Sequence, residues 1–220
     1  MLQEVAPTPI RYRIRLTVTQ NSALEEYLKR TTLFWNLLMF QLRHQFETYM
    51  LAPLGSKADE EIHRVAEQFF KEFIDPNGIY AVDISWIRFV NTIKELPADI
   101  LWSRMDDLLE AYRLAKMAAA NGKEATTGIP RHKSKNSSLS VRFNPGMYSL
   151  KNDQVIIHTS PRFDFALLLG SLPGDAAVIE KTHSLSITRR RLSNQPDDSF
   201  GPKSQEDARY VVTFREYSET

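Results

Sequence analysis

Cations are concentrated on one short stretch near the middle of the chain. We call this stretch, Gly128–Lys135 (Gly-Ile-Pro-Arg-His-Lys-Ser-Lys), the strap. Pro130 fixes its own φ angle and biases Ile129 toward extended geometry, so the strap is predicted to be extended rather than helical. Cations held along an extended backbone are suited to bind the phosphates of a nucleic acid.

The sequence around the strap is also basic. Between Asn121 and Lys151 the only acid is Glu124. The Lys and Arg residues of this segment are Lys123, Arg131, Lys133, Lys135, Arg142 and Lys151. The alternative to a phosphate-binding segment is a solvated linker, because a run of charge usually marks only a solvated face. The residues alone leave both interpretations open.

A second set of cations lies near the N-terminus. Strict alternation of apolar and polar residues predicts a strand over Arg11–Thr19. One face would carry Tyr12, Ile14, Leu16 and Val18, and the other Arg11, Arg13 and Arg15. Arginine serves equally on a solvated strand face and in a row of guanidinium groups that meets an anionic partner, so both roles remain open.

The composition limits the class of protein. The chain has 220 residues, 42% of them hydrophobic, enough to form the core of one large domain or two small ones. Cysteine is absent, which excludes disulfides, thiolate nucleophiles and cysteine-ligated zinc or iron–sulfur sites. No apolar run reaches the length of a membrane span, and the N-terminus lacks the pattern of a secretion signal. We therefore expect a cytoplasmic protein without membrane contact.

Helical periodicity dominates between the first strand and the strap. Ser22 and Glu25 form the pattern of a capping box before a long apolar stripe. The predicted helices run from Ser22 to Leu51, from Ser56 to the turn at Pro76, from Asp83 onward, and from Pro97 to Asn121. His44 and His63 have no second ligand at metal spacing, so we expect neither a metal site nor a cofactor.

After Gly122 the hydrophobic period changes from 3.6 to 2. The predicted strands are Leu139–Phe143, Val155–Ile157, His183–Leu192 and Tyr210–Phe214, with an exposed polar loop over Ser193–Asp207. A first strand so far from the others cannot be stable alone. The order predicts an α+β fold: a small antiparallel β-barrel over residues 1–20 and 123–220, with a helical bundle inserted over residues 21–122.

This layout resembles the N-terminal half of the TnpB (OrfB-type) family. These are transposon-encoded RNA-guided nucleases, and they are similar to the compact type V CRISPR effectors. The strap resembles the family's Gly-aromatic-Pro-Arg-aromatic-Lys-Ser-Lys loop, with Ile129 and His132 in place of the two aromatic residues. The segments Phe34–Asn36, Leu96–Tyr112 and Ser140–Phe143 resemble the family's first long helix, the helix before the loop and the strand after it. Together these similarities cover nearly the whole chain.

The resemblance implies specific partners and contact residues. The barrel would be the family's wedge domain, of OB-like type, and the inserted helices its recognition bundle. The wedge barrel would hold a guide RNA through Arg11, Arg13, Arg15, Lys123, Arg131, His132, Lys133, Lys135 and Arg142. Residues near the flanking motif of a double-stranded target DNA would be Val82, Trp86, Ala98, Asp99, Trp102 and Asn144. For Trp86 and Trp102, packing between helices is an equally good alternative to contact with nucleotides.

The family's nuclease activity comes from a ribonuclease-H-like (RuvC) domain, whose three separated carboxylates hold two metal ions. The chain contains no such carboxylate set and lacks the family's zinc-ribbon cysteines. We therefore expect a DNA-targeting subunit that is not an enzyme by itself, with the nuclease domain supplied in trans. Two alternatives remain. One is a stand-alone RNA-guided binder, repressor or guide-RNA chaperone; the other is an unrelated enzyme, although neither a phosphate loop nor a nucleophile motif is present.

Overall fold

The computed structural model describes residues 10–14, 16–75, 90–122, 128–134, 137, 139–158, 165–168, 176–189 and 210–216. The fold is of the α+β class, as predicted. The chain divides into two compact units. The sheet unit comprises Met1–Leu28 and Lys135–Thr220, and the helical unit comprises Lys29–Ser134. The domain boundaries expected from the sequence, after residues 20 and 122, stay a prediction.

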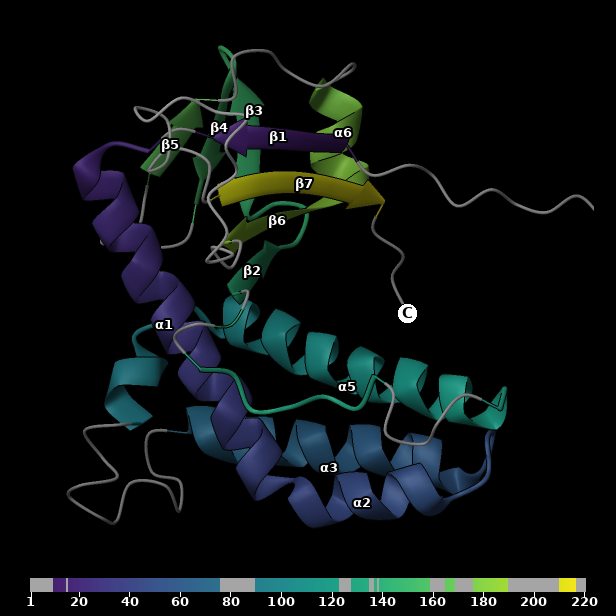
Figure 1. Cartoon of the computed structure of the whole chain (residues 1–220). Coiled ribbons are helices and arrows are strands. Elements are labelled where there is room, and N and C mark those ends of the chain that lie inside the picture. Colours follow the sequence, from purple (N-terminus) through teal and green to yellow (C-terminus); the bar gives the residue numbers. More distant parts are fainter. Residues whose placement is uncertain are drawn as a thin grey trace, which may run out of the picture. The chain divides into compact units, whose positions relative to one another are not determined.

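The sheet unit contains a four-stranded antiparallel sheet (Figure 1). Its strands, in spatial order, are β1 (Ile10–Ile14), β7 (Tyr210–Glu216), β6 (His183–Arg189) and β2 (Leu139–Phe143). The prediction that the first strand pairs with strands beyond Ser138 is confirmed, because β1 pairs with β7 along its whole length. The pairing supplies hydrogen-bond partners for a strand that has no neighbour close in sequence.

A three-stranded antiparallel sheet lies in the same unit. Its strands are β3 (Tyr148–Lys151), β4 (Gln154–Ile157) and β5 (Phe165–Leu168). Asn152 and Asp153 connect β3 to β4 with φ angles of 51° and 58°, as a tight two-residue hairpin turn requires. The strands β3 and β5 and the short helix α6 (Ala176–Thr182) were not predicted. Among the described strands no pairing joins the two sheets, so the closed barrel remains a prediction.

The core of the sheet unit lies on the apolar face of the four-stranded sheet. The buried residues of that face include Ile14, Val141, Phe143, Leu185, Ile187, Val212 and Phe214. Helix α1 (Val18–Gln41) contributes its first turns, residues 18–28, to this unit. The Tyr27 ring lies 6.2 Å from that of Phe143, and the Tyr210 hydroxyl donates to Asn21 Oδ1 at 2.9 Å and to Glu25. These contacts join the start of α1 to two strands, β2 and β7.

The junction between β1 and α1 differs from the prediction. The strand ends at Ile14 rather than Thr19, and the helix begins at Val18 rather than Ser22. The capping box is formed by Thr17 and Gln20: the Gln20 N–H donates to Thr17 Oγ1 at 3.2 Å, and the Thr17 N–H donates to Gln20 Oε1 at 2.9 Å. The box assigned to Ser22 and Glu25 was therefore wrong. Val18, expected on the inner strand face, is 88% exposed in the first turn of the helix.

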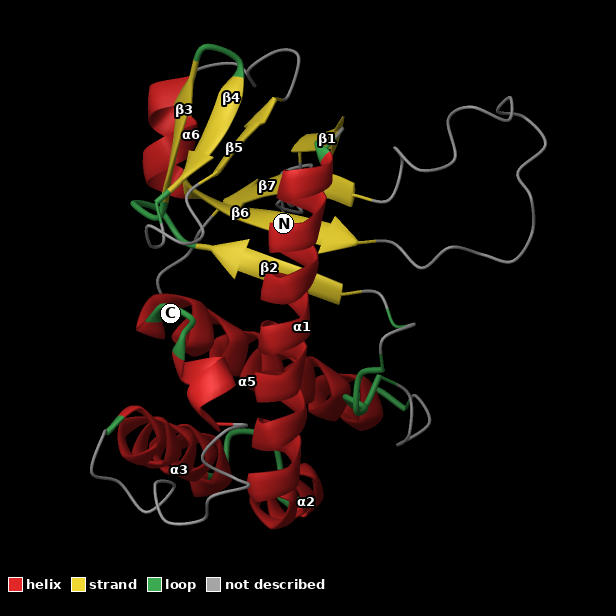
Figure 2. Ribbon diagram, turned by 90° about the vertical axis from the view of Figure 1, so that its left-hand side faces the viewer, coloured by secondary structure: helices red, strands yellow, loops and turns green. Residues whose placement is uncertain are grey.

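The helical unit is built from the remainder of α1, α2 (Arg43–Leu51), α3 (Lys57–Ile74), a helical segment at residues 90–94 and α5 (Ala98–Ala120) (Figure 2). The single helix predicted over Ser22–Leu51 is interrupted at Leu42, whose φ and ψ angles of −100° and 14° separate α1 from α2. Ile62, Ala66, Phe69 and Phe73 recur at helical spacing along the second predicted helix and form a buried apolar stripe in α3. Asn121 and Gly122 end α5 as expected, with Gly122 at a φ angle of 78°.

A buried cation connects three helices of this unit. The Lys116 Nζ atom of α5 lies 3.0 Å from Asp59 Oδ1 of α3 and 3.9 Å from the centre of the Tyr49 ring of α2. The Lys116 side chain is 4% exposed, whereas that of Asp59 is 36% exposed. The hydrogen bond from Lys116 lowers the pKa of Asp59, and burial, assisted by Asp59, raises the pKa of Tyr49 to about 12. The pair therefore holds a charge inside the bundle, where loss of one partner is costly.

Within the described part of the chain, no helix combines the length and the apolar character needed to cross a lipid bilayer.

Candidate nucleic-acid interface

The strap is described from Gly128 to Ser134 and contains neither helix nor strand, as predicted. It is held in place by two consecutive residues of α1. The Trp35 indole N–H donates to the carbonyl oxygen of Arg131 at 3.1 Å. The Asn36 side-chain amide donates to the carbonyl oxygen of Lys133 at 2.8 Å and accepts from the Lys133 N–H at 2.8 Å. Both main-chain polar groups of Lys133 are thus satisfied by one side chain, which fixes the local conformation of the strap.

Lys133 also uses its side chain to hold the strap. Its Nζ atom lies 4.2 Å from the centre of the Trp35 ring, and the Arg104 guanidinium of α5 lies 4.5 Å from the same ring. Arg104 is 3% exposed and pairs with Asp107 at 3.4 Å. Burial, and then repulsion by Arg104, lower the pKa of Lys133 to about 8, although Asp107 opposes the change. Two cations therefore share one aromatic ring in a partly desolvated place.

The strap presents its other polar side chains to solvent. Arg131, His132 and Ser134 are exposed, while Lys133 is half-buried. Arg131 and His132 are therefore the strap residues best placed to bind a phosphate. Lys123 and Lys135, predicted to have the same role, lie outside the described residues.

The second cationic surface is the polar face of the four-stranded sheet, which we call the hydroxyl–guanidinium face. The register places Arg11 opposite Thr213, Thr213 opposite Ser186, and Ser186 opposite Arg142. Residues that pair directly across strands point to the same face, so these four form one row. The described residues of this face are Arg11, Ser140, Arg142, Ser184, Ser186, Thr188, Val211, Thr213 and Arg215, and none is acidic.

Accessibility varies along the row. Arg11 is exposed and Arg142 is half-buried, whereas Thr213 between them is 7% exposed. Arg142 also takes part in an interaction within the chain. Arg13 pairs with Val211 in the register, but its side chain is outside the described residues, as is all of Arg15. Arg215, near the end of the inner strand β7, is also exposed, so the described cations of this face are Arg11 and Arg142 on the edge strands and Arg215 on an inner strand.

The residues expected near the target DNA motif fall into both units. Ala98 and Asp99 are exposed in the first turn of α5. Trp102 is half-buried, and its ring packs edge-on against Phe70 at 4.9 Å, which favours the packing alternative for this residue. Asn144 follows β2 in the sheet unit, and its Oδ1 atom is buried without a hydrogen-bond partner. Val82 and Trp86 lie outside the described residues.

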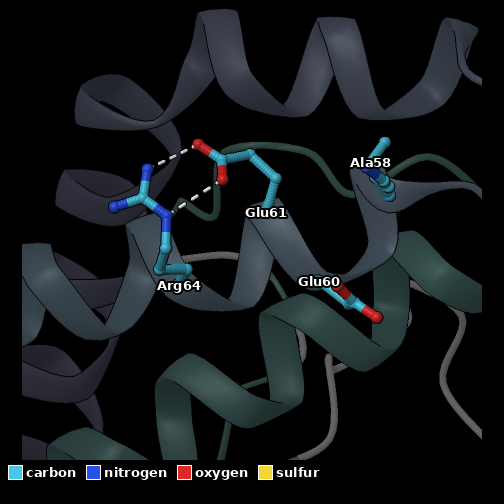
Figure 3. Close-up of a pocket in the computed structure, with 5 residues that line it drawn as sticks. Ala58, Glu60, Glu61 and Arg64 are labelled. Carbon is cyan, nitrogen blue, oxygen red and sulfur yellow. Dashed lines mark hydrogen bonds and ion pairs between the residues drawn. The ribbon is translucent and has the colours of Figure 1, made fainter.

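The hollows on the helical unit have a different character. One lies along the outer side of α3 and is lined by Lys57, Ala58, Glu60, Glu61 and Arg64 (Figure 3). Arg64 makes two hydrogen bonds to Glu61, at 2.6 and 2.9 Å, so its guanidinium is already occupied. Among the described residues no group of three His, Asp or Glu side chains is placed to hold a metal ion.

Several residues of these surfaces were not singled out from the sequence as functional. Trp35 and Asn36 entered only as part of a resemblance, and Ser186, Thr213 and Arg215 were not considered. A signal for Asn36 exists, because a carboxamide beside a core tryptophan requires a partner when it is half-buried. The strand alternation of Ser184–Thr188 was visible, but its pairing partners were not.

Comparison with models of known protein families and with curated protein sequences finds no match to this chain. The argument for function therefore rests on the two surfaces themselves.

Proposed function

We propose that this chain is the guide-RNA-binding and target-DNA-binding subunit of a split RNA-guided DNA-targeting system. It would not cut DNA by itself, and a RuvC-like nuclease domain would be supplied by another chain. Membership of the TnpB-type family is part of this proposal, as are a closed wedge barrel and a cytoplasmic location.

The observation that carries the proposal is the hydroxyl–guanidinium face. Guanidinium groups bind phosphates in a bidentate manner, and hydroxyl groups commonly contact phosphate and sugar oxygens. An adjacent carboxylate would repel a polyanion, and the described residues of this face include none. Ser184, Val211 and Thr213 of this face are buried. The exposed Arg11 and Arg215 and the half-buried Ser140, Arg142, Ser186 and Thr188 have the chemistry of a surface that follows a nucleic-acid backbone.

The strap gives independent support. Its contacts join two segments that each resemble a segment of the same family. These are the strap itself and the Trp35–Asn36 pair of the first long helix. These segments are 96 and 97 residues apart in the two contacts, so their association is a property of the tertiary fold. The result is a cationic segment without helix or strand, with Arg131 exposed to solvent.

The first test is binding. A fluorescently labelled hairpin RNA should bind the purified chain, with an affinity that falls steeply as salt increases, because phosphate contacts release counterions. Failure to bind, or binding without salt dependence, would contradict the proposal.

The second test concerns catalysis. The chain should not cleave guide-matched DNA in the presence of Mg²⁺, whereas addition of a RuvC-like partner should restore cleavage. Metal-dependent cleavage by the isolated chain would refute the non-catalytic part of the proposal. RNA-directed DNA binding without any cleavage partner would favour a stand-alone binder or repressor.

A further inference from the structure

The contacts of Asn36 have a geometry that ordinary core packing does not require. Its carboxamide forms two hydrogen bonds of 2.8 Å to a single residue, one to the N–H and one to the carbonyl oxygen of Lys133. This imitates the pairing between two β-strands, but with a helix side chain as the partner. One amide thereby fixes the backbone orientation of Lys133 and of the residues on either side of it.

The second anchor acts two residues earlier. The Trp35 indole donates to the Arg131 carbonyl, and the Trp35 ring lies under the Lys133 ammonium group. The strap is thus attached through its main chain at Arg131 and through its main chain and side chain at Lys133. The side chains of Arg131 and His132 take no part in these attachments and are exposed.

We propose that Asn36 and Trp35 are positioning residues for nucleic-acid binding: they hold the strap in its binding conformation, so that Arg131 and His132 meet phosphates without first being ordered. The inference rests on the proposed function and adds to it the residues that set the affinity without touching the ligand. Its physical basis is that a flexible loop loses conformational entropy when it binds, whereas a loop that is already fixed does not.

A positioning residue and a contact residue differ in a measurable way. Each phosphate contact contributes roughly 0.7 to 0.9 to the slope of log affinity against log salt concentration, so Arg131→Ala should reduce that slope by about this amount. Asn36→Ala removes no phosphate contact. It should therefore weaken binding at every salt concentration by a similar factor, roughly tenfold, and leave the slope unchanged.

The experiment measures binding of a fluorescein-labelled hairpin RNA to the full chain by anisotropy over a series of salt concentrations. Trp35→Phe retains the ring but loses the indole N–H, so it should weaken binding by roughly threefold. Asn91→Ala is the matched control, because Asn91 is an exposed residue of the same unit in the helical segment 90–94. Hydrogen exchange provides a readout without ligand: the Lys133 amide should be protected in the wild type and should exchange faster in Asn36→Ala.

Three outcomes would overturn the inference. The first is that Asn36→Ala and Trp35→Phe bind RNA as well as Asn91→Ala does, although the wild type binds. The second is that Asn36→Ala lowers the salt slope as Arg131→Ala does, which would make Asn36 a contact residue. The third is a Lys133 amide that exchanges equally fast in the wild type and in Asn36→Ala. If the wild type does not bind the RNA at all, the proposed function fails and the inference fails with it. If Asn36→Ala is unfolded by circular dichroism, Trp35→Phe and wild-type exchange decide the question.

Discussion

Arg11 and Arg142 provide the sharpest test of the hydroxyl–guanidinium face. They stand at the two edges of one row, on strands β1 and β2 of the order β1-β7-β6-β2. Three inter-strand spacings separate them, which amounts to about 14 Å. At physiological ionic strength the Debye length is about 8 Å, so the two charges barely interact through solvent. If both bind phosphates, their contributions should be independent.

The expected magnitude follows from this independence. Arg11→Gln and Arg142→Gln should each lower the slope of log affinity against log salt by about 0.7 for single-stranded RNA, or about 0.9 for a duplex. The double variant should lower it by about 1.4 to 1.8, the sum of the two single changes. Fluorescence anisotropy with a labelled RNA, repeated over a range of salt concentrations, measures these slopes directly.

Arg43 is the matched control for non-specific loss of charge. Its side chain is 79% exposed on α2, where it pairs with Glu47. Arg43→Gln should leave the slope unchanged. The assignment of the sheet face is refuted if the double variant retains the wild-type slope, or if Arg43→Gln alters it as much as Arg11→Gln does. A double variant equal to either single variant would show that only one edge of the row binds.

Three further predictions concern stability and pH. Asp59→Asn should lower the free energy of unfolding by about 3 kcal/mol, because it leaves the buried Lys116 ammonium without its partner. Lys116→Met should lower it by less than about 1 kcal/mol. Equal losses for the two variants in urea unfolding would disprove this asymmetry. In the folded protein the pKa of Asp59 lies below its ordinary value of 3.8. The ionised carboxylate should therefore stabilise the fold above pH 3.8, and this stabilisation should be lost as the pH falls through the lower pKa of the folded state. Unfolding measured at a series of acidic pH values checks this. RNA affinity should fall between about pH 7 and pH 9 as the Lys133 ammonium loses its proton. The Lys133→Arg variant stays charged, so its RNA affinity should not change over this pH range. The same pH dependence in wild type and variant would rule out Lys133 as the cause of the fall in affinity.

The elements that were predicted well are those whose signal is local. The α3 stripe and the Asn121-Gly122 stop were both visible in the sequence, because each depends on residues within a few positions of one another. The prediction of the junction between β1 and α1 was wrong because two neighbouring segments carry the same local pattern. Thr17-Val18-Thr19-Gln20 and Ser22-Ala23-Leu24-Glu25 are both capping boxes by pattern, and strand alternation continued through the first of them. The choice between them depended on the helix turns that contact Tyr210, far along the chain.

The candidate site divides in the same way. The sequence by itself determined the non-helical, cationic character of the strap and the α+β class, because proline geometry, charge and hydrophobic period are properties of short segments. Only the tertiary structure decided that Trp35 and Asn36 hold the strap, that Lys133 turns inward onto a ring shared with Arg104, and that Arg11 and Arg142 belong to one row. These are hydrogen bonds, ring contacts and strand registers between residues far apart in the sequence. Such contacts form only when packing brings distant segments together, and no local pattern specifies which partner each residue will meet.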